Sequence, residues 1–394
     1  MLTMKPGRKA AELEEEIISL RRDFHRHPEL GREEHRTSGI VCDYLEKAGL
    51  EVRRAAETGV IGLLEGEGEG DTVMLRADMD AVPVQEENDF AYSSTVDGVA
   101  HCCGHDGHTA MLLGAAKILS EMRSEIEGNI KFVFQPNEEE AGAHLMIEAG
   151  VLENPAVDAV FGIHLWSLLE SGTVGICAGP MMASSHYFEL EIQGTGGHAG
   201  APHNAVDPVA CAGSIMDTVY TMQSRELDAL EPTVISFCSL NAPSSPTIIP
   251  EKASLSGSIR CLHDEFSSVR ERFERTVAGV CTAHDVDYKL EVSLGNSLLK
   301  NDEELTELVR DSAADLPGGE NLESEVEVML GEDFAEYGYH APLAFCFLGI
   351  ADEDKGTHYP HHHPRFDIDE DMLTVGTELH VRNALAFLEC ENYR

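Results

Sequence analysis

Four short stretches of this chain are rich in side chains that can bind metal ions. Imidazole, thiolate and carboxylate groups are the protein ligands of divalent ions such as Zn²⁺, Ni²⁺, Co²⁺ and Mn²⁺. The stretches are residues 76–80 (RADMD), 101–108 (HCCGHDGH), 135–140 (QPNEEE) and the single residue His164. All but the second directly follow an apolar run. Together they indicate a site for divalent metal ions.

Taken one at a time, these residues have ordinary structural explanations. A single histidine at the end of a strand, such as His164, is commonly a hydrogen-bonded structural residue, and adjacent glutamates in a chain with 71 acidic residues commonly form a solvated surface. Cys103 and His105, however, are separated by one residue on a glycine-containing turn, which can present both side chains to one site. Glu138 and Glu139 follow an apolar run, where a buried unpaired charge is costly without a cation. In combination, the residues favour a metal site.

The apolar pattern predicts the elements that position these stretches. Helical spacing of apolar residues occurs at 11–27 and 109–122, and short apolar runs typical of strands occur at 59–64, 72–75, 130–134 and 157–163. Strands that alternate with helices predict an α/β fold with a mixed, largely parallel sheet and helices on both of its faces. Ligands of such sheets bind at the carboxyl ends of the strands. We therefore expect the metal-binding stretches to meet at one sheet edge.

From residue 185 onwards the pattern changes to alternating apolar and polar residues. The strand and helix patterns between residues 185 and 295 follow the order β-α-β-β-α-β, which is the ferredoxin-like arrangement. We therefore expect a first domain made of residues 1–183 and 298–394. An inserted ferredoxin-like α+β domain would occupy residues 184–297.

The chain is unusually acidic, with 28 basic and 71 acidic residues and a formal net charge of −43 at pH 7. Phosphate contacts need Lys and Arg, so we expect neither nucleic acid nor an anionic membrane surface as a partner. Self-repulsion of this size destabilises a compact chain unless counterions screen it. Because the acidic excess runs along the whole chain, we expect a halophile with a salt-rich cytoplasm rather than a merely acidic mesophile protein.

The sequence also predicts a cytoplasmic location. No run approaches the roughly 18 apolar residues of a membrane-spanning helix, and residues 1–16 lack the apolar core of a secretory signal. Ten cysteines without a Cys-x-x-Cys spacing are typical of reduced thiols rather than of a disulfide framework.

Seven motifs follow one another along the chain. They begin at Arg22 (RDFHRHPEL), Leu75 (LRADMDAVP), His101 (HCCGHDGHT), Phe134 (FQPNEE), Gly162 (GIHL), Gly194 (GTGGHA) and His362 (HHPRF). In this order they make the chain resemble the amidohydrolase branch of the dinuclear metallopeptidases. That branch includes hippurate hydrolases, N-acyl-amino-acid amidohydrolases, N-acetyldiaminopimelate deacetylases and plant hydrolases of auxin conjugates. The resemblance covers nearly the whole chain.

The resemblance implies two divalent metal ions per subunit, which could be Zn, Mn, Co or Ni. Matched motif by motif, the ligands would be Cys103, His105, Glu139, His164 and His362. Glu138 would be the general base that takes a proton from the attacking water and passes it to the leaving nitrogen. Within the histidine run 361–363 the motif position selects His362, with His358 as the alternative.

Asp80 and Asp106 would support the ligands by orienting them or by holding the turn. The alternative is that both are ordinary turn aspartates. Cys103 stands where other branches of the family place a carboxylate that bridges the two ions.

In the inserted domain the resemblance implies two substrate contacts and a role in self-association. His198 would reach the substrate carbonyl, often in the active site of a partner subunit. Arg260 would hold the carboxylate of an acyl amino acid, a role that suits a bidentate guanidinium. The alternatives are a loop histidine and a surface ion pair. The family motif Asn-Val-Ile-Pro reads Thr-Ile-Ile-Pro from Thr247, which shortens or removes a polar substrate contact. We expect a homodimer or a higher homo-oligomer.

The expected function is therefore metal-dependent hydrolysis of the amide bond of an N-acyl amino acid or a similar small amide. The alternative enzymatic function is that of a carboxypeptidase or dipeptidase of the same fold. The alternative from another class is a non-catalytic metal-binding protein that kept the fold, although Glu138 would have no use in mere metal storage.

Overall fold

The computed structural model describes residues 6–316 and 321–390. Residues 1–5, 317–320 and 391–394, which all belong to the expected first domain, lie outside the described residues. The chain divides into two compact units, the first built from residues up to 179, from 300–326 and from 333 onwards, and the second from 180–299 and 327–332. The expected domain boundaries, after residue 183 and before residue 298, lie within a few residues of the boundaries between these units. Residues 327–332, in contrast, were expected in the first domain.

The first unit is built on an eight-stranded sheet. In spatial order its strands are β1 (Glu51–Ala55), β2 (Gly59–Glu65), β4 (Asn129–Gln135), β3 (Thr72–Asp78), β5 (Ala159–Glu170), β16 (Leu343–Ala351), β6 (Val174–Gly175) and β15 (Leu322–Glu323). The central strands β4, β3, β5 and β16 run parallel, whereas β1, β2 and β4 pair antiparallel at one edge. The expected mixed, largely parallel sheet is confirmed.

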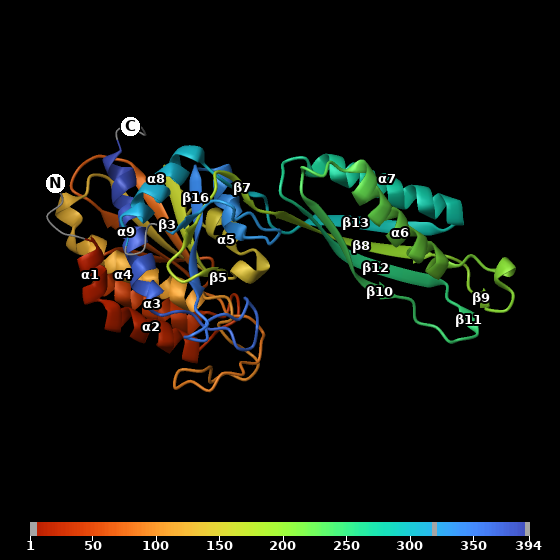
Figure 1. The fold of residues 1–394 in the computed structure, drawn as a ribbon, viewed down its shortest axis with the longest axis horizontal. Coiled ribbons are helices and arrows are strands. Elements are labelled where there is room, and N and C mark those ends of the chain that lie inside the picture. The colour runs from red at the N-terminus through yellow and green to blue at the C-terminus, as the bar shows by residue number, and fades with distance from the viewer. Residues whose placement is uncertain (1–5, 317–320, 391–394) are drawn as a thin grey trace. The chain divides into compact units, whose positions relative to one another are not determined.

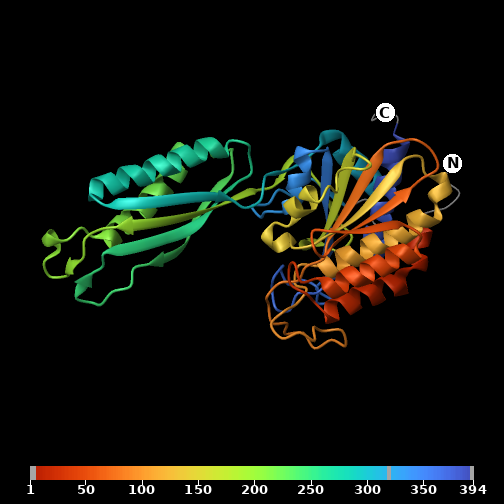
Figure 2. The ribbon, with the colours of Figure 1, turned by 180° about the vertical axis from the view of Figure 1, so that it is seen from behind.

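Helices cover both faces of this sheet (Figures 1 and 2). Six helices contribute side chains to one large hydrophobic core: α1 (Pro6–Glu12), α2 (Glu14–Arg26), α3 (His35–Lys47), α4 (His105–Glu121), α8 (Glu303–Ala314) and α9 (Met372–Glu389). Helix α4 is buried along almost its whole length and packs on α2, α9 and β3. The short helix α5 (Ala143–Glu148) and the 3-10 segment η4 (Asp333–Tyr339) pack against each other outside this core.

The second unit is a four-stranded antiparallel sheet with two helices on one face, as Figures 1 and 2 show. Its elements are β8 (Ser184–Gln193), α6 (Pro208–Glu226), β10 (Thr233–Asn241), β12 (Lys252–Cys261), α7 (Phe266–His284) and β13 (Asp287–Leu294). The spatial order β10-β12-β8-β13 is that of a ferredoxin-like sheet, as expected. Asp207 caps α6 by accepting hydrogen bonds from the backbone N–H groups of Val209 and Ala210.

Shorter elements complete the chain. They are the strands β7 (Gly179–Met182), β9 (Gly197–His198), β11 (Ile248–Ile249) and β14 (Leu299–Asn301), and the 3-10 turns η1 (Arg123–Glu125), η2 (Glu138–Glu140) and η3 (Pro202–Asn204). Strands β9 and β11 pair with each other in the second unit.

Several predicted elements have different bounds in the structure. The strand expected at residues 72–75 continues to Asp78, so Arg76 and Asp78 lie inside β3 rather than after it. The helix expected at residues 11–27 is two helices, α1 and α2, separated at Leu13. The strand expected to end at residue 163 continues to Glu170, so His164 lies inside β5 rather than at its end. His164 is polar and therefore interrupts the apolar pattern. The backbone pairing between β5 and β16 nevertheless continues past His164.

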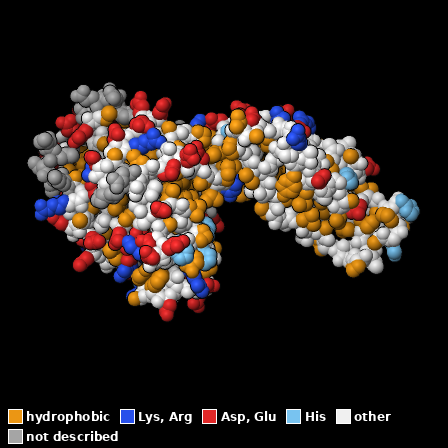
Figure 3. Space-filling model, in the orientation of Figure 1, with side chains coloured by type: hydrophobic (Ala, Val, Ile, Leu, Met, Phe, Trp, Pro, Cys, Tyr) orange, Lys and Arg blue, Asp and Glu red, His pale blue; other side chains and the backbone are white. Residues whose placement is uncertain are grey.

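Acidic side chains are spread over the face of the first unit that Figure 3 shows, and they do not gather in one place. Within the described residues, no helix has both the length and the apolar character needed to cross a bilayer. All ten cysteines are free thiols.

Candidate metal centre

The metal-binding stretches of the first unit meet where several of its elements end. Strands β3 and β4 are paired in register, so that Asp78 lies opposite Gln135 and the residues that follow each strand start side by side. Helix α4 begins at His105, directly after Gly104, whose φ of +94° is a left-handed conformation that suits glycine. The fifth ligand candidate, His362, comes from the loop between β16 and α9.

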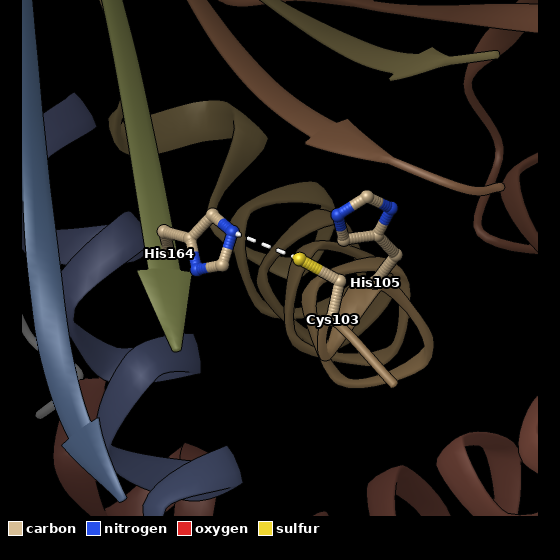
Figure 4. Close-up of side chains that lie close together, drawn as sticks. All are labelled: Cys103, His105 and His164. Atoms are coloured by element: carbon tan, nitrogen blue, oxygen red, sulfur yellow. Dashed lines mark hydrogen bonds between the residues drawn. The ribbon is translucent and has the colours of Figure 1, made fainter. Parts of the chain in front are cut away.

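Cys103, His105 and His164 lie close together, as Figure 4 shows. The Nδ1–H of His164 donates to the carbonyl of Leu165 at 2.7 Å, which turns Nε2 towards the Sγ of Cys103 at 3.7 Å. The Nδ1 of His105 lies 3.0 Å from the Asp80 carbonyl oxygen and 3.2 Å from Asp80 Oδ1. The Nε2 of His105 is buried and has no hydrogen-bond partner. An inward-facing ring nitrogen without a partner is what a metal ligand requires.

Glu138 and Glu139 lie in η2, which is bracketed by two left-handed residues. Asn137 before the turn has a φ of +59° and Ala141 after it has a φ of +61°. Such conformations are uncommon for residues other than glycine and are frequent at functional sites. The turn brings an Oε2 of Glu138 to 3.9 Å from His105 Nε2.

The side chain of His362 completes a second group of candidate ligands. Its Nε2 lies 3.0 Å from Glu139 Oε1. The backbone of His362 is itself left-handed, with a φ of +62°, and its N–H donates to the carbonyl of Cys102 at 2.8 Å. The loop that carries His362 is therefore fixed directly to the segment that carries Cys103.

Electrostatics show that this cluster favours bound positive charge. Hydrogen bonds to Cys103 and Glu139 raise the pKa of His362 to about 10. Burial lowers the pKa of His105, but the negative charges of Asp78 and Cys103 outweigh it and raise that pKa well above its usual value. The surrounding carboxylates and the thiol thus favour positive charge at both of these imidazoles.

The residues fit a pair of metal ions. Cys103, His105 and His164 offer three ligand atoms that all lie within 4.8 Å of one another, and Cys103, Glu139 and His362 do the same. Because both groups include Cys103, its thiolate would be available as a ligand in either group. The donor set of one thiolate, three imidazoles and a carboxylate suits Zn²⁺, Co²⁺, Ni²⁺ or Mn²⁺.

The two aspartates expected to support the site have different surroundings. Asp80 contacts ligand candidates directly, because besides His105 its Oδ2 accepts the backbone N–H of Glu139 at 3.1 Å. Asp106 is turned away from the ligands: its Oδ2 accepts from Arg21 Nε at 2.8 Å and lies 2.7 Å from His25 Nδ1.

Asp78 and His108 form a supporting pair that the sequence analysis did not single out. Asp78 Oδ1 lies 2.6 Å from Nδ1 of His108, and Nε2 of His108 accepts the backbone N–H of Leu165 at 2.9 Å. Both ring nitrogens of His108 are therefore occupied, and the ring holds the strand beside His164. The signal was in the sequence, because both residues belong to the metal-binding stretches.

The structure distinguishes the four histidines near residue 360. Among the described residues, His362 is the one of these four that joins a group of candidate metal ligands. His361 is packed against Trp166 and accepts a hydrogen bond from the backbone N–H of Ser167 at 3.3 Å. The rings of His358 and His363 each stack on the ring of Tyr359, with ring centroids 4.6 Å apart in both pairs.

The proposed substrate contacts lie in the second unit. His198 is exposed on β9, and its Nδ1 accepts the backbone N–H of Gly200 at 3.0 Å. Arg260 is half-buried on β12 and donates from Nη1 to the Met329 carbonyl at 3.1 Å. Thr247 is exposed beside β11, and its carbonyl accepts the N–H of Ala199.

Known proteins resemble the chain over almost its whole length. The sequence profile described as peptidase family M20/M25/M40 matches residues 74–386. Thermostable carboxypeptidase 1 of Saccharolobus solfataricus is 38% identical over 95% of this chain and 96% of its own. An N-acyl-L-amino acid amidohydrolase of Geobacillus stearothermophilus is 41% identical over 72% of this chain and 77% of its own. Among solved structures, a dinuclear metal-binding peptidase of Bacillus subtilis superposes with a TM-score of 0.85 at 32% identity, covering 96% of this chain and 99% of that one.

Proposed function

Because the chain belongs to peptidase family M20/M25/M40, we propose that it hydrolyses the amide bond of N-acyl amino acids or similar small amides. The observation that carries the proposal is the cluster of Cys103, His105, Glu139, His164 and His362. It leaves a ring nitrogen of His105 without a partner, with the carboxylate of Glu138 at 3.9 Å.

The proposed ligands would hold two divalent ions through the two groups that share Cys103. Bound there, the ions supply Lewis acidity, which polarises the substrate carbonyl and lowers the pKa of the attacking water. Asp80 holds the His105 ring and the backbone of Glu139 in place from behind.

Glu138 would move the proton. Its carboxylate takes a proton from the attacking water as the oxygen adds to the substrate carbonyl, and then gives that proton to the nitrogen as the C–N bond breaks. The products are a carboxylate and a free amine. Glu138 is buried, with a side chain 9% exposed, which keeps bulk water from competing for the proton.

His198 and Arg260 remain our proposal for contacts with the substrate carbonyl and carboxylate. A homo-oligomer is proposed as well, supported by large hydrophobic side chains exposed on the second unit, among them Val209, Tyr220 and Leu240. Hydrophobic side chains gather on the face of that unit drawn in Figure 3. Light scattering after gel filtration measures the oligomeric state.

A carboxypeptidase or dipeptidase activity is the second candidate, favoured by the similarity to the Saccharolobus protein. The two functions differ in whether the substrate carries a free α-amine. The test is turnover of hippurate and N-acetylmethionine, compared with the dipeptide Gly-Met, by the metal-loaded and the chelator-treated protein at high salt. Metal-dependent cleavage of the acylated compounds supports the proposal. Preferential cleavage of Gly-Met supports the second candidate, and no cleavage of any of the three overturns both.

A further inference from the structure

Arg21 connects two segments of the first unit that each carry a proposed ligand. Its side chain on α2 is completely buried. Nε donates to Asp106 Oδ2 at 2.8 Å, and Nη2 donates to Asp367 Oδ1 at 2.6 Å. Asp106 directly follows His105, and Asp367 lies on the loop of His362.

Each aspartate is held by a second group as well. His25, one turn after Arg21 on α2, places Nδ1 at 2.7 Å from Asp106 Oδ2. The hydroxyl of Tyr92 donates to Asp367 Oδ2 at 2.8 Å. The guanidinium therefore lies between two carboxylates that each have a second partner, and its Nη2 also lies 3.2 Å from His25 Nδ1.

Two of the links between the two segments do not involve the side chain of a proposed ligand. The first is the hydrogen bond from the backbone N–H of His362 to the Cys102 carbonyl at 2.8 Å. The second is the Asp106–Arg21–Asp367 bridge. The loop is held elsewhere as well, because the backbone N–H of Glu87 donates to the Pro364 carbonyl at 2.8 Å and Asn88 Nδ2 donates to the Phe366 carbonyl at 3.1 Å. The Arg21 bridge adds a link that runs to the residue directly after His105.

A planar guanidinium is suited to this task. It presents donors in fixed directions and can bridge two carboxylates, whereas an ammonium group is a point charge on a flexible stem. Breaking such a buried pair leaves an uncompensated charge inside the protein. The geometry of the bridge, and not only its charge, is thus what the two segments depend on.

We propose that Arg21 is a positioning residue of the metal site, which fixes the segment of His105 against the segment of His362 so that their imidazoles converge beside Cys103. The inference rests on the metal-dependent function proposed above. Within the described residues, Arg21 hydrogen-bonds to none of the proposed ligands and acts through Asp106 and Asp367.

Arg22 offers a matched control. It is the next residue of α2 and donates to Glu370, which Arg21 also contacts. Both guanidinium groups lie over the ring of Tyr92, at 4.9 Å for Arg22 and 5.1 Å for Arg21. The Arg22 side chain is 48% exposed, however, and its hydrogen bonds go to Glu370.

The experiment is a titration of the metal-free protein with Co²⁺, read by the thiolate-to-cobalt absorption band and by calorimetric stoichiometry. The variants are Arg21→Lys, Asp367→Ala and the control Arg22→Lys. Arg21→Lys keeps the positive charge but loses the planar guanidinium that bridges Asp106 and Asp367. We therefore expect the affinities for both Co²⁺ ions to fall at least tenfold. Asp367→Ala should weaken mainly one ion, because it releases only the His362 segment. Arg22→Lys should bind like the parent.

The outcomes separate this inference from the proposed function. If the parent chain does not bind two Co²⁺ ions, the proposed function fails, and this inference fails with it. If the parent binds two ions and Arg21→Lys or Asp367→Ala binds both with parental affinity, Arg21 does not position the site. Circular dichroism of the metal-free variants checks folding. If both variants are unfolded while Arg22→Lys is folded, Arg21 is a residue of the fold rather than of the site, and the inference is overturned.

Discussion

Asp80 accepts a hydrogen bond from the backbone N–H of Glu139 at 3.1 Å, while its other carboxylate oxygen lies 3.2 Å from His105 Nδ1. One carboxylate thus fixes a proposed ligand from α4 and the backbone of another from η2. A carboxylate can do this because both of its oxygens are acceptors, whereas an amide has one acceptor and one donor group.

We predict that Asp80→Asn weakens metal binding. The amide nitrogen would have to face a hydrogen-bond donor on one of its two sides. Either the Glu139 turn loses this support, or the His105 ring keeps only the Asp80 backbone carbonyl at 3.0 Å. The expected loss of metal affinity is ~10–100-fold, measured by titration of the metal-free protein. Asp97→Asn, on an exposed stretch of the loop before α4, is the control. Unchanged affinity in Asp80→Asn would show that the ligands are held without it.

Glu138 and Glu139 should respond differently to the same substitution. Glu138→Gln removes the proton carrier, so we expect kcat to fall by ~10²–10⁴ while both ions stay bound. Glu139→Gln removes a ligand, so we expect one ion to be lost on dialysis and activity to return partly at high metal concentration. Metal analysis and steady-state kinetics measure both effects. The reverse pattern would mean that the two roles are exchanged.

The adjacent cysteines provide a test of register. Cys103 faces both groups of candidate ligands, so Cys103→Ser should lower metal occupancy at both positions. Cys102 is buried and contributes its carbonyl to His362, which a side-chain change leaves in place. We therefore expect Cys102→Ala to keep the metal content of the parent. A loss of metal in Cys102→Ala with none in Cys103→Ser would contradict the assignment.

His186 should make the second unit sensitive to acid. Its ring stacks on Phe266, and burial lowers its pKa to about 4. An unfolded chain has a histidine pKa of about 6.5, so between pH 6.5 and pH 4 the unfolded state binds the proton that the folded state excludes. Stability contributed by this group therefore falls as the pH falls through that window.

The measurement is thermal unfolding of the parent and of His186→Phe from pH 7 to pH 4.5. His186→Phe keeps an aromatic ring against Phe266, and it should lose less stability on acidification than the parent. Tyr187→Phe, which changes the neighbouring exposed residue, should behave like the parent. Equal slopes in parent and His186→Phe would show that His186 does not titrate on unfolding in this range.

High salt should stabilise the protein. With a formal net charge of −43, self-repulsion is screened progressively as the Debye length falls to ~3 Å at 1 M salt. We expect the unfolding temperature and the activity to rise with KCl up to molar concentrations. Full stability in dilute buffer would contradict a halophilic origin.

The spacing of apolar residues in the sequence was sufficient to predict the fold class and the two-domain organisation. Alternation of apolar runs and helical spacings predicted the parallel sheet and the order of the inserted domain, because both depend on periodicity that short windows retain. The position of His164 inside β5 was missed, since a polar residue in a buried strand is indistinguishable from a strand end when its partner strand is unknown.

The supporting residues of the site were harder to predict. Arg21 and His25 lie on α2, about 80 residues before Asp106, and Asp367 lies far beyond it. Only the folded chain shows that these residues meet. Asp106 was expected to orient ligands or hold a turn, and its actual partners come from segments that carry no metal-binding pattern of their own.

His362, whose backbone conformation is left-handed, lies on the loop before α9. The other four proposed ligands lie between residues 103 and 164. During synthesis on the ribosome, the segment that contains Cys103, His105 and His164 is made before the inserted unit, and His362 is made after it. Because chains fold as they are synthesised from the amino end, the two halves of the site become available at different times. In a nascent chain that ends after the inserted unit, the thiolate and two of the imidazoles would be present, whereas the group that includes His362 would be incomplete.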